Sequence, residues 1–330
     1  MISGSSGRVP VRVVYHHRYN IGFFGLERLH PFDARKYGRA WSVLKQELGS
    51  GLLEFHTKVD RPVSDRELLL VHSQEYLAQL RQSKVIAMTL EMPLFQFAPA
   101  WLLRWRVLQP MRWAARGSVL AARAALETGV AVNLSGGYHH AKPTQGEGFC
   151  VFSDAALLVR QLRVEGKIQE TDRIAYIDLD AHQGNGVCHQ FRGDREVFLF
   201  DMYNKDIYPK ADYEARERID CNVPLAFNCL GGEYLRLLRD KLPGFLDSIS
   251  KSATVRLAIY NAGTDVFAGD KLGGMCLSAD DILERDLFVI RELRKRQIPV
   301  VMLLSGGYSR KSYRLVAATV LHLIKNGVDV

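Results

Sequence analysis

Short apolar runs recur along the chain, and longer segments with helical periodicity separate them. Most of the runs are continuously apolar rather than alternating, which is typical of strands buried on both faces of a parallel sheet. Six such runs predict strands: VRVVY (11–15), VAVNL (130–134), RIAYIDLD (173–180), EVFLF (196–200), VRLAIYNA (255–262) and IPVVMLL (298–304).

Helical periodicity predicts helices over 154–166, 233–250 and 279–296. The last of these follows Ser278, a residue type that commonly caps helix N-termini. Alternating strands and helices predict an α/β fold with helices on both faces of the sheet.

The chain is long enough for one large domain or two ordinary ones. It has no internal repeat and no linker rich in Pro, Gly or Ser, so we expect a single domain over 11–330. The segment 1–10 contains SGSSG and is expected to form a flexible N-terminal tail.

The net charge of +8 comes partly from segment 101–126, where four arginines alternate with tryptophans: Arg104, Arg106, Arg112 and Arg116. One interpretation is a face for nucleic acid or anionic lipid. The other is an amphipathic helix pair whose arginine stems cover a core. No nucleic-acid motif accompanies the charge, so the second interpretation is favoured and no direct nucleic-acid partner is expected.

The five cysteines are scattered, and no CxxC pair occurs. This pattern favours a reducing compartment over a disulfide framework. The first residues lack the basic segment followed by an apolar run that marks a secretory signal peptide. The sequence also has no apolar stretch long enough to span a membrane. The expected location is therefore the cytoplasm or the nucleus; nothing in the pattern sets an oligomeric state.

Polar, glycine-containing segments follow four of the predicted strands. SGGYHH comes after 130–134, DLDAHQGNG closes 173–180, NAGTD closes 255–262, and SGGY follows 298–304. In open parallel sheets, ligands bind outside the carboxyl ends of the strands. These four segments should therefore converge on one site.

Three of the polar residues have the composition of a catalytic metal site. Residues spaced by two on an extended chain share one face, so Asp180 and His182 can reach one point. Asp265, at the end of another strand, can supply a third ligand. Two carboxylates and one imidazole suit Zn²⁺ or Fe²⁺ with positions left open for substrate.

A metal ion of this kind polarises a carbonyl and lowers the pKa of its bound water toward about 7. A hydrolase also needs proton-transfer groups, which His139 and His140 can supply, and an oxyanion donor, for which Tyr308 is available. Asp178 and Asn185 can orient the two imidazole rings. Each motif alone is weak, and their joint occurrence at four strand ends points to the site.

At these residues the sequence resembles the arginase-like histone deacetylase family. The motifs GGYHHA, GEGFC, YIDLDAHQGNG, NAGTDVFAGDKLGG and LLSGGY stand in the family's order, and the resemblance extends from about residue 11 to 325. RYNIGFFGLERLHPFDARKYG and NKDIYP are similar to the class IV branch. The resemblance implies one domain with a mainly parallel eight-stranded sheet. It also implies zinc-dependent removal of acyl groups from the ε-nitrogen of lysine in proteins or peptides.

By position, the resemblance implies roles for individual residues. Asp180, His182 and Asp265 match the metal ligands, His139 and His140 the tandem histidines, and Tyr308 the transition-state tyrosine. A structural potassium ion is implied near Asp178, Asp180 and His182. Gly148, Phe149, Tyr208 and Leu272 match positions that form the walls of the acyl-lysine channel.

The chain departs from class I enzymes at position 185, where asparagine replaces aspartate. A neutral amide orients His140 without favouring its charged form, so we favour His140 as the base. The loop 83–100 offers only Glu91 as an acidic rim residue. The class IV resemblance also implies long-chain fatty acyl substrates. The alternatives are deacetylation of a small amine such as acetylpolyamine, and a catalytically silent binding module.

Overall fold

The computed structural model describes residues 11–25, 27, 32–251 and 253–328, so the predicted tail at 1–10 lies outside the described residues. Within this part of the chain, eight strands form one sheet in the order β2-β1-β3-β8-β7-β4-β5-β6, and all neighbouring strands are parallel. The strands are β1 (Val11–Tyr15), β2 (His56–Lys58), β3 (Val130–Asn133), β4 (Arg173–Asp178), β5 (Val197–Asn204), β6 (Cys221–Leu225), β7 (Val255–Asn261) and β8 (Val300–Leu303).

Helices connect the strands and cover the sheet. The longer ones are α1 (Lys36–Leu48), α7 (Gln109–Thr128), α8 (Asp154–Val164), α11 (Gly231–Ser250), α12 (Ala279–Lys295) and α13 (Ser312–Asn326). The shorter α-helices are α2 (Leu52–Phe55), α3 (Asp65–Leu68), α4 (Gln74–Gln79), α5 (Ser83–Thr89), α6 (Ala100–Leu103), α9 (Asn185–Gln190) and α10 (Tyr213–Glu217). Further turns of helix are η1 (His17–Tyr19), η3 (Gly49–Gly51), η4 (Pro93–Phe97) and the π-helical η5 (Arg104–Leu108).

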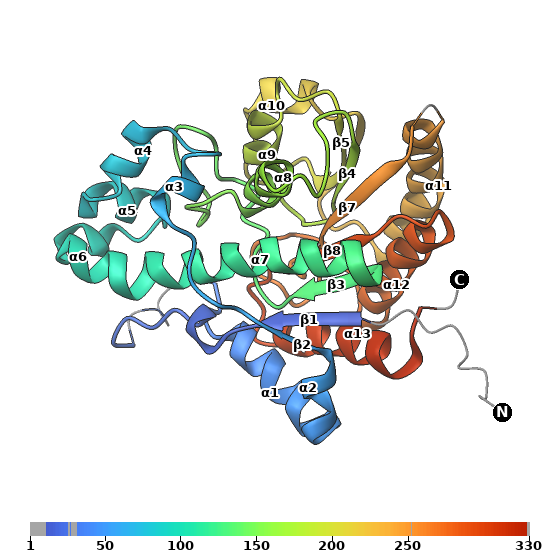
Figure 1. Ribbon diagram of the computed structural model, residues 1–330, viewed down its shortest axis with the longest axis horizontal. Coiled ribbons are helices and arrows are strands. Elements are labelled where there is room, and N and C mark those ends of the chain that lie inside the picture. Colours follow the sequence, from blue (N-terminus) through green and yellow to red (C-terminus); the bar gives the residue numbers. More distant parts are fainter. Residues whose placement is uncertain (1–10, 26, 28–31, 252, 329–330) are drawn as a thin grey trace.

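The molecule is a layered α/β domain. Helix α7 packs on β1, β3 and β8, and α8 packs on α7 (Figure 1). In a second group of helices, α1 packs on α13, α13 on α12, and α12 on α11. This group contacts the sheet where α12 packs on β8 and α11 packs on β5. The predicted single α/β domain with an eight-stranded parallel sheet is confirmed. No described helix is both long and apolar enough to cross a membrane.

The six predicted strands are all present; most of their ends differ by one or two residues, but β5 continues to Asn204, four residues past its predicted end. Strands β2 and β6 are not anticipated by the hydrophobic pattern, and both lie at sheet edges. β2 has only three residues, His-Thr-Lys, none of them buried. β6 contains Pro224, which an edge strand tolerates because one side of it has no ladder to complete.

Segment 100–128 is not the separate helix pair that its sequence predicts. Helix α6, the π-helical turn η5 and α7 follow one another without an intervening loop, so the segment is a nearly continuous helix. Arg112 pairs with Asp65, and Arg116 pairs with Asp60. The stems of Arg112 and Arg116 thus pack inward from α7, whereas Arg106 is half-buried and Arg104 is exposed.

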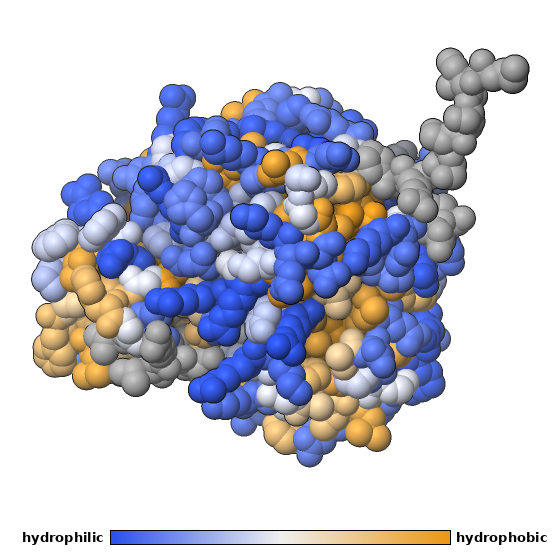
Figure 2. Space-filling view, turned by 90° about the horizontal axis from the view of Figure 1, so that it is seen from below, coloured by the Kyte–Doolittle hydropathy of each residue, from blue (hydrophilic) through white to orange (hydrophobic). Residues whose placement is uncertain are grey.

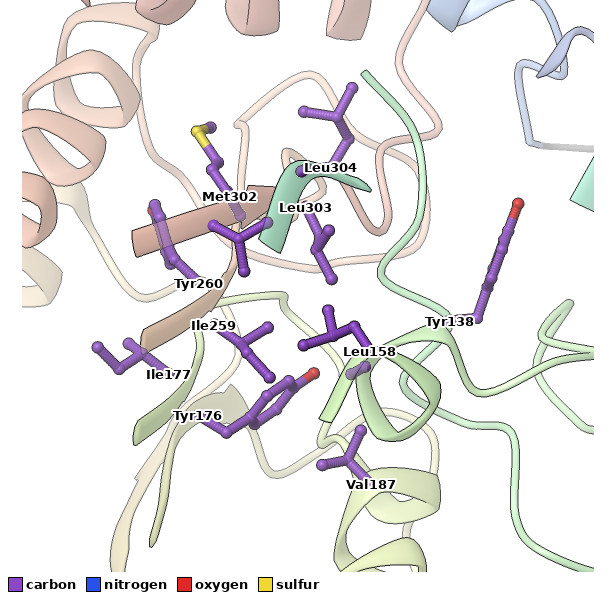
Figure 3. Close-up of a cluster of buried hydrophobic side chains, with 14 of the residues drawn as sticks. Tyr138, Leu158, Tyr176, Ile177, Val187, Ile259, Tyr260, Met302, Leu303 and Leu304 are labelled. Carbon is purple, nitrogen blue, oxygen red and sulfur yellow. The ribbon is translucent and has the colours of Figure 1, made fainter. Parts of the chain in front are cut away.

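The elements α5, η4 and α6 pack against one another at the left end of the molecule in Figure 1. Figure 2 shows apolar side chains gathered on the surface at this end. Most of the remaining apolar side chains are buried between sheet and helices. The close-up in Figure 3 shows Leu158 of α8, Val187 of α9 and Ile259 of β7 pointing into one cluster.

A buried arginine ties α12 to the ends of two central strands. Arg285 is fully buried, lies 2.8 Å from the Asp286 carboxylate, and donates hydrogen bonds to the carbonyls of Leu179 and Gly263 at 3.1 and 2.7 Å. These carbonyls belong to the segments that carry Asp180 and Asp265. The fold therefore places a fixed cation directly beneath the polar strand ends.

We expect Arg285→Met to lower the free energy of unfolding by about 3–5 kcal/mol, because Asp286 would remain buried without its cation. Urea unfolding followed by circular dichroism measures this change. The matched control is Arg239→Met, since the pair of Arg239 with Glu284 is about half exposed and such pairs contribute about 0–1 kcal/mol. Equal losses in the two variants would contradict the role given to Arg285.

Candidate active site

The four polar segments converge because their strands are neighbours. β3, β8, β7 and β4 lie side by side in the sheet and run in the same direction. Their carboxyl ends therefore open onto one edge, where 134–150, 179–190, 262–275 and 304–309 follow them. The convergence predicted from the order of motifs is present.

Asp180, His182 and Asp265 form a buried cluster whose ligand atoms all lie within 4.8 Å of one another. His182 Nδ1 is 3.1 Å from Asp180 Oδ1 and 2.9 Å from Asp265 Oδ2. The other carboxylate oxygens accept backbone N–H groups, Asp180 from Gly306 at 2.8 Å and Asp265 from Ala181 at 2.9 Å. The backbone thus holds both carboxylates in place with one oxygen of each facing the imidazole.

Two carboxylates this close and this deeply buried need positive charge between them. Burial and the Asp180 charge raise the pKa of Asp265 to about 7. Burial lowers the pKa of His182, but the bonds with Asp180 and Asp265 outweigh it and raise that pKa to about 10. A divalent cation can replace the proton, and two carboxylates with one imidazole form a donor set that fits Zn²⁺ or Fe²⁺.

His139 and His140 lie beside this cluster, with ring centroids 4.1 Å apart. His139 Nδ1 is 2.9 Å from Asp178 Oδ2, and His140 Nδ1 is 2.7 Å from Asn185 Oδ1. Burial lowers the pKa of His139, but Asp178 and the nearby Asp180 raise it to about 9. Burial and the neighbouring histidines hold the pKa of His140 well below 6.5. The two adjacent rings therefore have opposite preferences for a proton.

Three residues that the sequence analysis does not single out hold the Asn185 side chain. Its Nδ2 donates to Glu147 Oε1 at 2.5 Å and to Asp212 Oδ2 at 3.1 Å. Lys142 Nζ bridges the same carboxylates at 3.1 and 2.9 Å. Because both amide hydrogens point at carboxylates, Oδ1 must face His140. The Nδ1 of that ring then carries the proton, and Nε2 keeps its lone pair.

Tyr308 lies at the edge of the cluster, with its ring centroid 6.0 Å from that of His182. Its loop is held from two sides. Asp270 accepts the Tyr308 backbone N–H at 2.6 Å, and the buried Lys36 donates to the carbonyls of Ser305 and Gly306 at 2.6 and 2.8 Å. Lys36 lies within the motif RYNIGFFGLERLHPFDARKYG and Asp270 within NAGTDVFAGDKLGG, but neither motif indicates a contact with the Tyr308 loop.

A pocket of about 800 Å³, its open mouth included, extends from the two histidines and Tyr308. Among the predicted channel residues, Gly148 and Phe149 line it. Gly148 has φ +53°, and a Cβ there would lie 2.5 Å from the His140 ring, so only glycine fits. The rest of the wall is mainly apolar and includes Phe23, Leu90, Met92, Phe95, Val107 and Met111.

Tyr208 and Leu272 are not among the described residues that line this pocket. Tyr208 is 39% exposed and packs edge-on against His140, with centroids 5.0 Å apart. Leu272 is half-buried in the loop that Asp270 organises, where its backbone N–H donates to that carboxylate at 3.0 Å. Segment 83–100 is not the expected loop, because it forms α5 and η4. Glu91, its acidic residue, lies between these two elements and is exposed.

Comparisons with known proteins show the family to which the chain belongs. The family model described as "Histone deacetylase domain" matches residues 30–324. The chain is 41% identical to Histone deacetylase 2 from Arabidopsis thaliana over 319 residues, which covers 96% of this chain and 80% of that protein.

Two solved structures have a similar fold. The crystal structure of the HDA15 HD domain aligns with a TM-score of 0.74 at 18% identity and covers 97% of this chain and 90% of its own. The crystal structure of an HDAC homologue complexed with SAHA aligns with a TM-score of 0.69 at 22% identity. The alignment covers 95% of this chain and 83% of the homologue's chain. With the family model matching most of its length, the chain belongs to the histone deacetylase family of hydrolases.

Proposed function

We propose that this protein is a zinc-dependent lysine deacylase, which hydrolyses the amide bond between an acyl group and the ε-nitrogen of lysine. The observation that carries the proposal is the closeness of three features, two of which line one pocket while the third lies beside them through His182. These are the buried Asp-His-Asp cluster, two histidines with different partners, and a tyrosine hydroxyl. Asp180, His182 and Asp265 would hold the ion; Fe²⁺ suits the same donors.

Zinc bound at this cluster would polarise the substrate carbonyl and lower the pKa of a water molecule. The side chains would handle the protons. His140 has a free lone pair on Nε2 because Asn185 accepts from its Nδ1, so it is the proposed base. His139, beside the Asp178 carboxylate, is the proposed acid for the leaving amine. The Tyr308 hydroxyl would donate to the oxyanion.

We also propose a structural potassium ion beside Asp178, Asp180 and His182. In the part of the chain that the structure describes, Asp201 Oδ1 is buried and has no hydrogen-bond partner. Burial and the Asp178 charge raise the pKa of Asp201 well above its usual value. A monovalent cation near these two carboxylates would satisfy that oxygen and offset their repulsion.

The apolar pocket supports long-chain acyl groups as substrates, in addition to acetyl. Six of its described wall residues come from 18–38, the segment that resembles the class IV branch, and all but Glu27 are apolar or aromatic: Ile21, Phe23, Glu27, Phe32, Ala34 and Tyr37. Such a wall gains free energy from covering an alkyl chain, at about 0.8 kcal/mol for each buried CH₂. We propose membership of the class IV branch on the same grounds.

Asp265→Ala is expected to weaken zinc binding by a factor on the order of 100 or more and to abolish turnover, because one of three ligands is lost. Metal content of the purified protein and zinc titration calorimetry measure the first effect. Asp240→Ala, an exposed carboxylate on α11, is the control and should bind zinc normally. Turnover by a zinc-loaded Asp265→Ala protein would refute the ligand set.

Tyr308→Phe should keep the metal but lower kcat by a factor of about 10²–10³, the usual effect of losing one oxyanion donor. The aromatic contact with Phe149 is retained by the new side chain, so stability should change little. Steady-state kinetics together with metal analysis test this expectation. An unchanged kcat would remove the hydroxyl from the reaction.

Glu147→Leu should lower kcat/KM by about tenfold or more without loss of metal, because Asn185 loses one of the two carboxylates that orient it. The loss should fall on kcat, since the base is misoriented. Gln145→Ala is the matched control: Gln145 bonds the same carboxylate at 2.8 Å but does not touch Asn185. Equal effects of the two changes would contradict the orienting role.

The proposed function is tested by turnover of one lysine peptide that carries acetyl, octanoyl or myristoyl, and of acetylpolyamine, with and without chelator. Chelator-sensitive turnover of the peptides is expected. Val107→Phe, which narrows the buried pocket, should lower kcat/KM for myristoyl by about tenfold and leave acetyl nearly unchanged. Turnover of acetylpolyamine alone would assign a small-amine deacetylase, and no turnover by zinc-loaded protein would favour a binding module.

A further inference from the structure

We call segment 81–106 the apolar corner; it comprises α5, η4, α6 and the start of η5. Large apolar side chains stand out from it into solvent. Their exposed fractions are 67% for Met88, 63% for Leu94, 80% for Phe97, 66% for Trp101 and 59% for Trp105. Figure 2 shows the apolar surface at this end of the molecule. Such a gathering exceeds the scattered apolar exposure of ordinary surfaces.

Packing does not require these side chains to be apolar. The inner side of the corner is a separate set of residues, of which Leu90, Met92 and Phe95 line the pocket. Leu94 and Phe97 flank the buried Phe95 and point away from it. The corner would hold its shape with polar residues at the outer positions. Their apolar character therefore points to a partner.

The charge of the corner indicates what that partner is. Arg81, Lys84, Arg104 and Arg106 carry positive charge, against a single acidic residue, Glu91. Arg106 lies over the rings of Trp105 and Phe24, at 4.8 and 5.0 Å from the centroids. Cationic side chains beside exposed tryptophan and phenylalanine are typical of segments that lie in the interface of an anionic bilayer.

Shape separates a membrane from a peptide partner. Trp101, Trp105, Arg81 and Arg104 line a hollow together with residues of α4 and α7, and Leu94 and Phe97 are exposed but are not among its described lining residues. A peptide bound in the hollow would leave Leu94 and Phe97 in water, whereas a bilayer surface can cover both sets of side chains. A bilayer accepts protruding side chains because its acyl region deforms around them. Nucleic acid would contact the arginines but would gain nothing from exposed leucine, methionine and phenylalanine side chains.

We propose that the apolar corner docks this protein on anionic lipid surfaces. Leu94 and Phe97 would enter the acyl region, the two tryptophans would lie at the headgroups, and Arg81, Lys84 and Arg104 would meet lipid phosphates. The proposal rests on this surface alone and stands whether or not the proposed deacylase activity is found.

Co-sedimentation of the full chain with vesicles tests the proposal. We expect binding to vesicles of phosphatidylcholine mixed with phosphatidylserine, weak binding to phosphatidylcholine alone, and a decrease with added salt. Leu94→Ser with Phe97→Ser should lower the partition coefficient by about tenfold or more, since both lose burial in lipid. Replacing Arg81, Lys84 and Arg104 with glutamate should abolish the preference for phosphatidylserine.

The matched control replaces two equally exposed apolar residues elsewhere, Val164 and Leu230, with serine; their exposed fractions are 69% and 64%. This control should bind vesicles like the unchanged protein. The proposal is wrong if phosphatidylserine vesicles are not bound, or if the control loses as much binding as the corner variant.

Two other outcomes would also overturn it. A dimer in light scattering that the Leu94 and Phe97 changes convert to monomer would make the corner an interface between copies. Binding to duplex DNA that only the arginine and lysine changes remove, without vesicle binding, would make it a nucleic-acid surface. Melting temperatures of all variants show whether each one folds.

Discussion

The repulsion between Asp180 and Asp265 is the constraint around which the structure is arranged. Two carboxylates buried this deeply are stable only if positive charge and N–H donors surround them. The chain supplies His182 between them and the backbone amides of Gly306 and Ala181 behind them. Arg285 binds the carbonyls on both flanks from below. A cluster held this rigidly is ready to take a cation without rearrangement, which is what a metal-dependent hydrolase requires.

Neighbouring charges also shift the pKa values of the two adjacent histidines in opposite directions. They are neighbours in sequence and in space, yet one faces a carboxylate and the other an amide. The amide is itself oriented by Glu147 and Asp212, with Lys142 balancing their charge. A neutral partner can fix the tautomer of an imidazole without raising its pKa, whereas a carboxylate does both. The opposite pKa shifts of the adjacent histidines thus follow from the groups behind them.

Segment 81–106 joins the site to the surface. Its inner residues line the pocket beside the histidines, and its outer residues are apolar and exposed. A protein that removes long acyl chains from lysine would meet substrates whose acyl groups favour a bilayer. If the apolar corner docks on lipid and also forms part of the pocket wall, one segment of the chain serves both membrane binding and acyl-chain binding. Neither proposal depends on the other.

The periodicity and motif order of the sequence were enough to predict the α/β class, the central strands and the set of residues at the strand ends. Buried parallel strands leave continuous apolar runs, and their carboxyl ends must share an edge. The edge strands β2 and β6 left no such pattern because they are short or half exposed. Only the tertiary structure paired Asn185 with Glu147 and Asp212, and placed Lys36 and Asp270 against the Tyr308 loop. It also decided which arginines of 101–126 pair with Asp60 and Asp65 and which, such as Arg104, remain exposed. Such pairings depend on distances between segments far apart in the chain, and periodicity along the sequence carries no record of those distances.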